Sequence, residues 1–307
     1  MPCLRRLFPI LSAALLLVTG AVPALSQASG TESARAIEAA KAKLPPDSAK
    51  VLFGSQLTPA PLEARSIGTY ARGCLAGAVA MPVNGPDWQV MRLSRNRNWG
   101  HPSLVAFLER FAAAAQTDGW PGLLVGDMGQ PRGGPMLTGH ASHQIGLDAD
   151  IWLLPMPDRV LTPGERETIS AVSVVKSDKI EIDPKIWSPL HQRLIRRAAL
   201  DPAVARIFVN PAIKKALCES AGTDRGWLTK VRPWYGHNYH FHVRLACPPG
   251  MADCHPQEPP PAGDGCGKDL AWWLGPEPYK PEPPSPPKPP LKLADLPAAC
   301  AKVLDAR

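Results

Sequence analysis

The sequence predicts an α+β fold, because capped helical patterns are mixed along it with short stretches in which apolar and polar residues alternate. A second observation concerns the histidines. Five of the eight lie in two short segments, GHASHQIGLDAD at 139–150 and WYGHNYHFH at 234–242. Imidazoles concentrated in this way, with aspartates between them, are typical of a metal site or an acid–base site.

The first long helix is expected to begin at Pro102, since proline is favoured in the first turn of a helix, and to end at Gly119. A short buried strand is predicted at 123–125. The glycine-rich loop that follows leads to His140 and His143.

The next predicted strand, at 146–154, carries two carboxylates. Alternation along a strand directs Asp148 and Asp150 to one face and the apolar residues to the other. Both carboxylates would then lie beside the loop that carries His140 and His143.

Three more helices are indicated by their first residues. Thr162 and Glu165 form a capping box, and Pro189 and Pro211 each stand in a first helical turn. A short strand is predicted at 207–209.

The last predicted strand, 239–245, directs His240, His242 and Arg244 to one face and its apolar residues to the core. Two histidines at positions i and i+2 of a strand point the same way. One of them can then bind a metal while the other reaches a water on it.

The N-terminus reads as a secretory signal peptide, 1–26, with Arg5 and Arg6 before an apolar run and small residues at a cleavage site. The alternative is a membrane anchor, but the run is short for a bilayer span and contains a glycine and a proline. We expect export to the periplasm without stable membrane insertion.

Six cysteines remain after the signal peptide, an even number that favours three disulfides in an oxidising compartment. They are Cys74, Cys218, Cys247, Cys254, Cys266 and Cys300. No two of them form a Cys-x-x-Cys pair, which argues against zinc binding. Cys247 and Cys254 are close enough to close a small loop.

The chain has no internal repeat, so we expect one main domain at 27–272, followed by a proline-rich extension at 273–307. Its proline runs favour extended polyproline II structure, with a disordered tail as the alternative. Leu296 and Cys300 near the end indicate that the extension docks back, by a disulfide. The net charge of +7 is modest and spread out, which does not fit a nucleic-acid binder.

The segments GHASHQIGLDADIW and RPWYGHNYHFHVRLACP closely resemble the penicillin-insensitive murein endopeptidases. These belong to a group of zinc metallopeptidases that joins lysostaphin-type peptidases, D-alanyl-D-alanine peptidases and the hedgehog domain. The likeness runs from Ser66 to Cys300 and includes GCLAGA, NWGHPSLVAFLERF, GDMGQPRGG, RIFVNPAIKKALC, AGTDRGWLTKVRPW and GDGCG.

The resemblance implies three zinc ligands, His143, Asp150 and His242, which leave one tetrahedral position open as in a catalytic site. It also implies that His240 is the base or the stabiliser of the tetrahedral intermediate, and that His237 lines the cleft.

Two further residues match less common metal positions of the group. His140 matches a histidine sometimes counted among the metal-binding residues; its other expected role is to orient a ligand. Asp178 matches the aspartate of an Asp-x-x-His segment, but Glu181 stands where the histidine would be. This departure leaves a second metal there in question.

The resemblance further implies disulfides Cys74–Cys300 and Cys218–Cys266. We expect a small antiparallel sheet that carries the zinc site, flanked by helices and long loops. The implied activity is zinc-dependent hydrolysis of D-alanyl–meso-diaminopimelyl cross-links in peptidoglycan, with cross-linked muropeptides as partners. A D-Ala-D-Ala carboxypeptidase and a non-catalytic peptidoglycan-binding module are the alternatives.

Overall fold

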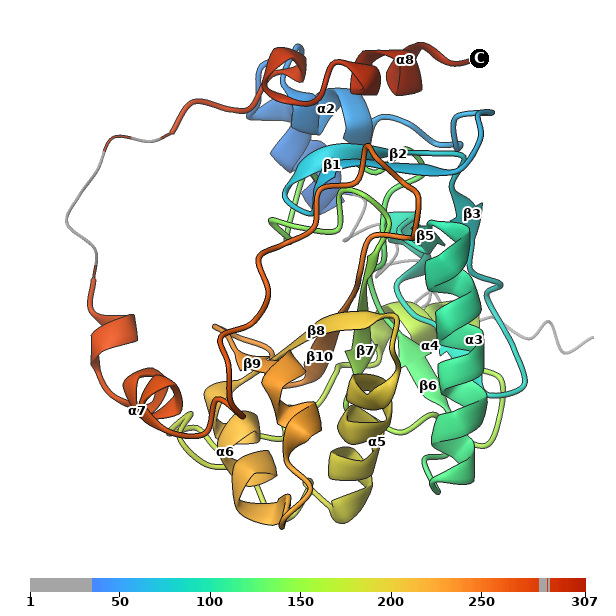
Figure 1. The fold of residues 1–307 in the computed structure, drawn as a ribbon. Helices are drawn as coiled ribbons and strands as arrows, with labels where there is room; N and C mark the ends of the chain where they lie inside the picture. The colour runs from blue at the N-terminus through green and yellow to red at the C-terminus, as the bar shows by residue number, and fades with distance from the viewer. Residues whose placement is uncertain (1–34, 282–285, 287) are drawn as a thin grey trace, which may run out of the picture.

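The computed structural model describes residues 35–281, 286 and 288–307 (Figure 1). The predicted signal peptide, 1–26, therefore lies outside the described residues, as do 282–285 and 287 of the predicted polyproline segment. Among the described residues, no helix combines the length and apolar character that a bilayer crossing requires.

A mixed six-stranded sheet forms the centre of the molecule, and two small two-stranded sheets lie beside it. The strands are β1 (Arg65–Thr69), β2 (Arg72–Ala76), β3 (Val79–Ala80), β4 (Trp88–Val90), β5 (Trp99–Gly100), β6 (Leu123–Val125), β7 (Asp148–Trp152), β8 (Val204–Val209), β9 (Val231–Pro233) and β10 (His240–Leu245).

Helices occur between and after these strands. The α-helices are α2 (Ala49–Gly54), α3 (Pro102–Thr117), α4 (Pro163–Thr168), α5 (Pro189–Leu200), α6 (Pro211–Ser220), α7 (Lys268–Leu274) and α8 (Ala299–Asp305). Short 3-10 helices are η1 (Leu93–Arg95), η2 (Gly226–Lys230), η3 (Glu277–Tyr279) and η4 (Leu293–Asp295).

The strand order of the large sheet is β4-β6-β7-β10-β8-β9. The four inner strands are antiparallel to one another, whereas the edge strands β4 and β9 are parallel to their neighbours β6 and β8. The α+β prediction is confirmed, with a mixed sheet in place of a purely antiparallel one. The parallel edges follow from two crossover connections, through α3 and through α6.

One face of this sheet packs on helices. In Figure 1, α3, α5 and α6 lie in the lower half of the view, next to the sheet. The buried residues Ile151, Ile207, Phe241 and Val243 join the same core as the apolar stripe of α3. Because strand residues alternate, the polar residues of β7, β8 and β10 are left on the opposite face.

The predicted helix starts are confirmed. Pro102 opens α3, and the backbone N–H of Ser103 donates to the His101 side chain at the N-cap. Thr162 and Glu165 form the expected capping box of α4. Prolines also open α5 and α6. A capping box and a first-turn proline act on the backbone of the helix start itself, so they can be identified without knowledge of the tertiary fold.

A second, smaller core lies at the top of Figure 1, where α2 and α8 pack against the β1–β2 hairpin. The disulfide Cys74–Cys300 lies in this core and joins β2 to α8. The disulfides Cys218–Cys266 and Cys247–Cys254 are also formed, so the three expected pairs are confirmed. The predicted division at residue 272 falls within α7 and stays a prediction.

Candidate metal centre and catalytic cleft

The two histidine segments meet on the face of the sheet opposite the one that packs on α3, α5 and α6. β7 and β10 are antiparallel neighbours, and their register places His242 opposite Asp150 and Arg244 opposite Asp148. The loop before β7 brings His140 and His143 over the same face.

The Asp150 carboxylate is buried at the centre of four imidazoles. Its Oδ1 lies 3.5 Å from His143 Nε2, 3.5 Å from His242 Nδ1 and 3.7 Å from His240 Nε2. Its Oδ2 lies 3.5 Å from His140 Nδ1. Burial alone would raise the pKa of Asp150, but the imidazoles of His240 and His143 hold it well below its usual range.

Hydrogen bonds fix the tautomers of two of these rings. Nδ1 of His143 donates to the Met128 carbonyl at 2.6 Å, which leaves a lone pair on Nε2. Nε2 of His242 donates to Asp148 Oδ1 at 2.9 Å, which leaves a lone pair on Nδ1. Both lone-pair nitrogens lie 3.5 Å from Asp150 Oδ1.

Three atoms of this cluster are buried and have no hydrogen-bond partner among the described residues: His143 Nε2, Asp150 Oδ1 and His240 Nδ1. An unpaired buried acceptor costs about 1–3 kcal/mol. Ligands about 2.0–2.2 Å from a tetrahedral cation would stand about 3.4 Å apart, close to the separations found here. The donor set therefore fits a divalent metal ion.

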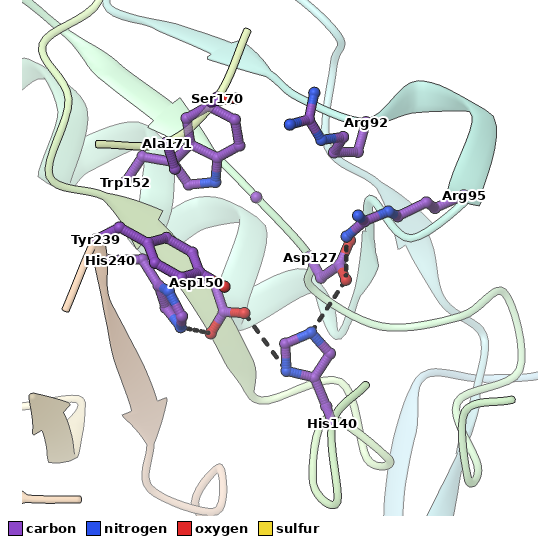
Figure 2. A pocket seen from close by; sticks show the side chains of 11 residues that line it. Arg92, Arg95, Asp127, His140, Asp150, Trp152, Ser170, Ala171, Tyr239 and His240 are labelled. Atoms are coloured by element: carbon purple, nitrogen blue, oxygen red, sulfur yellow. Dashed lines mark hydrogen bonds and ion pairs between the residues drawn. The ribbon is translucent and has the colours of Figure 1, made fainter. Parts of the chain in front are cut away.

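His140, His143 and Asp150 place their ligand atoms within 4.8 Å of one another. His140 is the most exposed of the three. Figure 2 shows its ring between Asp150 on one side and Asp127 on the other, with Nε2 at 3.0 Å from Asp127 Oδ2. It is therefore placed either to bind a metal or to be held beside one.

Asp148 anchors the two histidine segments to each other. Its Oδ1 accepts from His242 Nε2 and, at 2.7 Å, from Arg244 Nε. Its Oδ2 accepts from the backbone N–H of His143 at 3.0 Å. Burial alone would raise the pKa of Asp148. The charges of Arg244 and His242 outweigh burial and hold this pKa well below its usual range.

Asp127 occupies a similar position on the other side of the cluster, and the sequence analysis predicted no role for it. Its buried Oδ2 accepts from His140, from Arg97 at 2.9 Å and from Arg95 at 3.1 Å. The only sequence signal is an aspartate that comes just after a buried strand, β6.

His240 and His237 complete the cluster. Burial lowers the pKa of His240 to about 4, and its Nδ1 has no partner among the described residues. The His237 ring is centred 4.9 Å from that of His240, and its Nδ1 donates to the Tyr235 carbonyl at 2.6 Å. Burial also lowers the pKa of His237.

Asp178 lies apart from these residues, in an exposed turn. Its Oδ1 accepts the backbone N–H groups of Ile180 and Glu181, at 2.9 Å and 3.3 Å. The structure gives it no contact with the histidine cluster among the described residues.

Cavities open on two sides of the cluster. One, of about 210 Å³, is lined by Arg92, Arg95, Trp152 and Tyr239, which Figure 2 shows around Asp150. The other, of about 450 Å³, adjoins His237 and His242. His140 lines both, so an extended ligand can approach the cluster from either side.

Known proteins are similar to this chain over most of its length. A family model described as penicillin-insensitive murein endopeptidase matches residues 66–305. A protein of that name from Haemophilus influenzae is 50% identical over 223 residues, covering 71% of this chain and 76% of its own length. One from Klebsiella pneumoniae subsp. pneumoniae is 47% identical over 242 residues (79% and 86%), and one from Escherichia coli O1:K1 is 44% identical over 247 residues (80% and 88%). The chain therefore belongs to the penicillin-insensitive murein endopeptidase family of peptidases.

Proposed function

We propose that this chain is a zinc-dependent endopeptidase, exported to the periplasm, that hydrolyses D-alanyl–meso-diaminopimelyl cross-links in peptidoglycan. Family membership supports the reaction class. The observation that carries the metal is the pair of buried, unpaired atoms, His143 Nε2 and Asp150 Oδ1.

The zinc ligands would be His143 through Nε2, Asp150 through its carboxylate and His242 through Nδ1. The hydrogen bonds that fix both tautomers support this set, because a ligating nitrogen must carry a free lone pair. His140 is a further ligand or holds Asp150 in place. Asp178 remains a prediction from the sequence, and its exposed turn offers no support for it.

Zinc in such a site polarises the scissile carbonyl and lowers the pKa of a water from about 15.7 to near 7. The chain's own residues supply the rest. His240, next to Asp150, would take the proton from the attacking water and pass it to the leaving amine. The lowered pKa of His240 keeps its imidazole neutral, and therefore able to accept a proton, at neutral pH. His237 would contact the substrate at the cleft wall.

This reaction forms no acyl-enzyme, so a β-lactam has no serine to acylate. Insensitivity to penicillin then follows from the chemistry. The described cysteines are all paired in disulfides, which fits an oxidising compartment such as the periplasm.

Digestion of purified, cross-linked dimer muropeptides tests the proposal. We expect conversion to monomers, equally fast with and without benzylpenicillin, that stops after exhaustive chelation and returns when zinc is added. Trimmed terminal D-alanine would identify a carboxypeptidase instead, and intact dimers that still bind would identify a non-catalytic module.

A matched pair of variants makes the digestion specific for this site. His240→Ala should lose activity, whereas His255→Ala, at an exposed histidine outside the cluster, should not. Cleavage that persists after chelation, or in His240→Ala at the full rate, would contradict the proposed mechanism.

A further inference from the structure

Three arginines line the cavity of about 450 Å³ beside the proposed metal centre: Arg206, Arg232 and Arg244. They come from adjacent strands. The register places Arg206 of β8 opposite Arg244 of β10, and Arg232 of β9 beside Phe208 of β8. All three therefore lie on the face of the sheet that carries Asp148, Asp150 and His242.

Their charges are unequally neutralised. Arg244 is fully engaged, because it donates to Asp148 and, at 2.7 Å, to Gln257 Oε1. Among the described residues, the only carboxylate near Arg232 is Asp269, at 3.3 Å, and the Asp269 side chain is 53% exposed. The Arg232 side chain itself is 15% exposed, and its Nη1 is buried with no hydrogen-bond partner in the described part of the chain.

Arg206 has no carboxylate partner among the described residues. Its Nη2 donates to the backbone carbonyl of Glu258 at 2.6 Å. Like charges on opposing strand positions destabilise a sheet, and here Arg206 faces Arg244. The cluster therefore carries excess positive charge that an anion would offset.

Aromatic rings line the same cavity. Trp234 and Trp273 have ring centroids 5.7 Å apart, and Phe208, beside Arg232 on the sheet, lies 6.0 Å from Trp234. A cavity of about 450 Å³ lined by both arginines and aromatic rings suits an extended peptide that bears a carboxylate. By contrast, Arg95 on the other side of the cluster is already paired with Asp127.

We propose that Arg206 and Arg232 bind a free carboxylate of the cross-linked stem peptide in the cavity next to His237 and His242. This inference rests on the proposed function. Diaminopimelate has two carboxyl groups, and the one next to the scissile amide nitrogen stays free in a cross-link. The γ-linked glutamate of the stem also keeps a free carboxyl. Both offer the two acceptor oxygens that an arginine recognises.

Three cross-linked dimers test the inference: the free acid, one amidated only at the diaminopimelate carboxyl, and one amidated only at the glutamate carboxyl. For the unmodified protein we expect kcat/KM to fall about 10-fold or more for one amidated dimer, since a charge-assisted hydrogen bond is lost. The dimer that suffers the loss identifies the carboxylate.

Arg206→Gln should raise KM for the free acid, leave kcat nearly unchanged and bring the ratio of free to amidated cleavage close to one. Arg206→Lys should keep part of the ratio. Arg232→Gln should change KM and the ratio of free to amidated cleavage in the same direction. It replaces Arg206→Gln as the test if that variant does not fold. Arg110→Gln, an equal charge change at an exposed site on α3, should change nothing.

Equal cleavage of all three dimers by the unmodified protein, or an unchanged ratio in both glutamine variants, would overturn the inference. Calorimetric binding of the same dimers to chelated protein separates it from the proposed function. If the protein binds the free acid in preference to the amidated dimers but cleaves none of them, the carboxylate site is supported and the proposed peptidase function is contradicted.

Discussion

The Asp148 carboxylate connects the two segments that form the histidine cluster. It accepts hydrogen bonds from the His242 ring, the Arg244 guanidinium and the backbone N–H of His143. Since it is fully buried, each of these bonds is shielded from water and correspondingly strong. Asp148 thus sets both the tautomer of one proposed ligand, His242, and the position of another, His143.

Replacement of Asp148 by Asn should damage stability and metal binding together. The amide leaves Arg244 as a buried charge without a counterion, which costs about 3–5 kcal/mol in the free energy of unfolding. Loss of the carboxylate behind His242 should weaken zinc affinity about 10–100-fold. Urea unfolding and zinc competition measure the two effects, with the exposed Asp158→Asn as control. Unchanged zinc affinity would remove Asp148 from the centre.

The two histidines of β10 should fail differently when replaced. His242→Ala removes a proposed ligand, so bound zinc and activity should fall together. His240→Ala should keep zinc and lose about 10²–10⁴-fold in rate, the usual size of a proton-transfer or intermediate-stabilising contribution. Metal analysis beside muropeptide digestion distinguishes them. Zinc lost from His240→Ala but kept by His242→Ala would reverse the two roles.

The shared face of Asp150, His240 and His242 was predictable, because alternation along a strand is independent of tertiary context. The roles of Asp127 and Asp148 were not. Each role depends on which strands and loops are neighbours in the fold. Alternation along one strand shows which residues share a face, but it does not show which strand lies next to it.

At the scale of elements, α6 contains an unusual residue, a lysine with no exposed surface. Lys214 donates to the carbonyls of Leu228 and Asp264, at 2.8 Å and 2.6 Å. It thereby joins α6 to η2 and to the loop of the Cys218–Cys266 disulfide. Burial lowers its pKa from 10.5 to about 7.

This lowered pKa predicts that stability rises with pH between about 7 and 10. In that window the unfolded chain still binds the proton that the folded chain has released, so alkaline pH favours folding, by at most about 1.4 kcal/mol per pH unit. The gain is lost as pH falls toward 7. The urea midpoint of the unmodified protein should fall as the pH falls from 10 to 7. The midpoint of Lys214→Met should fall less steeply over the same range, because the variant has no lysine to titrate there. Identical pH slopes would show that Lys214 stays charged in the folded state.

The four strands predicted from the sequence are β6, β7, β8 and β10, which are adjacent at the centre of the sheet. The edge strands β4 and β9 are only three residues long, too short for a pattern of alternation. Their parallel direction comes from crossover connections, which no local pattern specifies.

On the scale of the whole molecule, the disulfide Cys74–Cys300 closes a loop across a sequence separation of 226, whereas Cys247–Cys254 spans only 7. Arg132 adds contacts across the same junction, because it donates to the carbonyls of Val303 and Leu304. The end of the chain is therefore tied to β2 both covalently and by hydrogen bonds.

Replacing both Cys74 and Cys300 by Ser should cost about 5 kcal/mol in the chain-entropy model, against about 2 kcal/mol for the same change at Cys247 and Cys254. We expect a lower Tm and proteolytic cleavage first near α8, while the zinc content stays unchanged. Thermal unfolding and limited proteolysis with mass spectrometry measure this. Equal losses of Tm in the two double variants would contradict the loop-length argument.

The same separation fixes an order of events during synthesis. A chain that emerges from its N-terminus first presents the Cys74 thiol long before Cys300 exists, and four other cysteines appear between them, Cys218, Cys247, Cys254 and Cys266. During that interval Cys74 can pair with any of these four thiols, and only thiol–disulfide exchange then releases it. We therefore expect the yield of the native protein to follow the redox poise of the compartment that receives it.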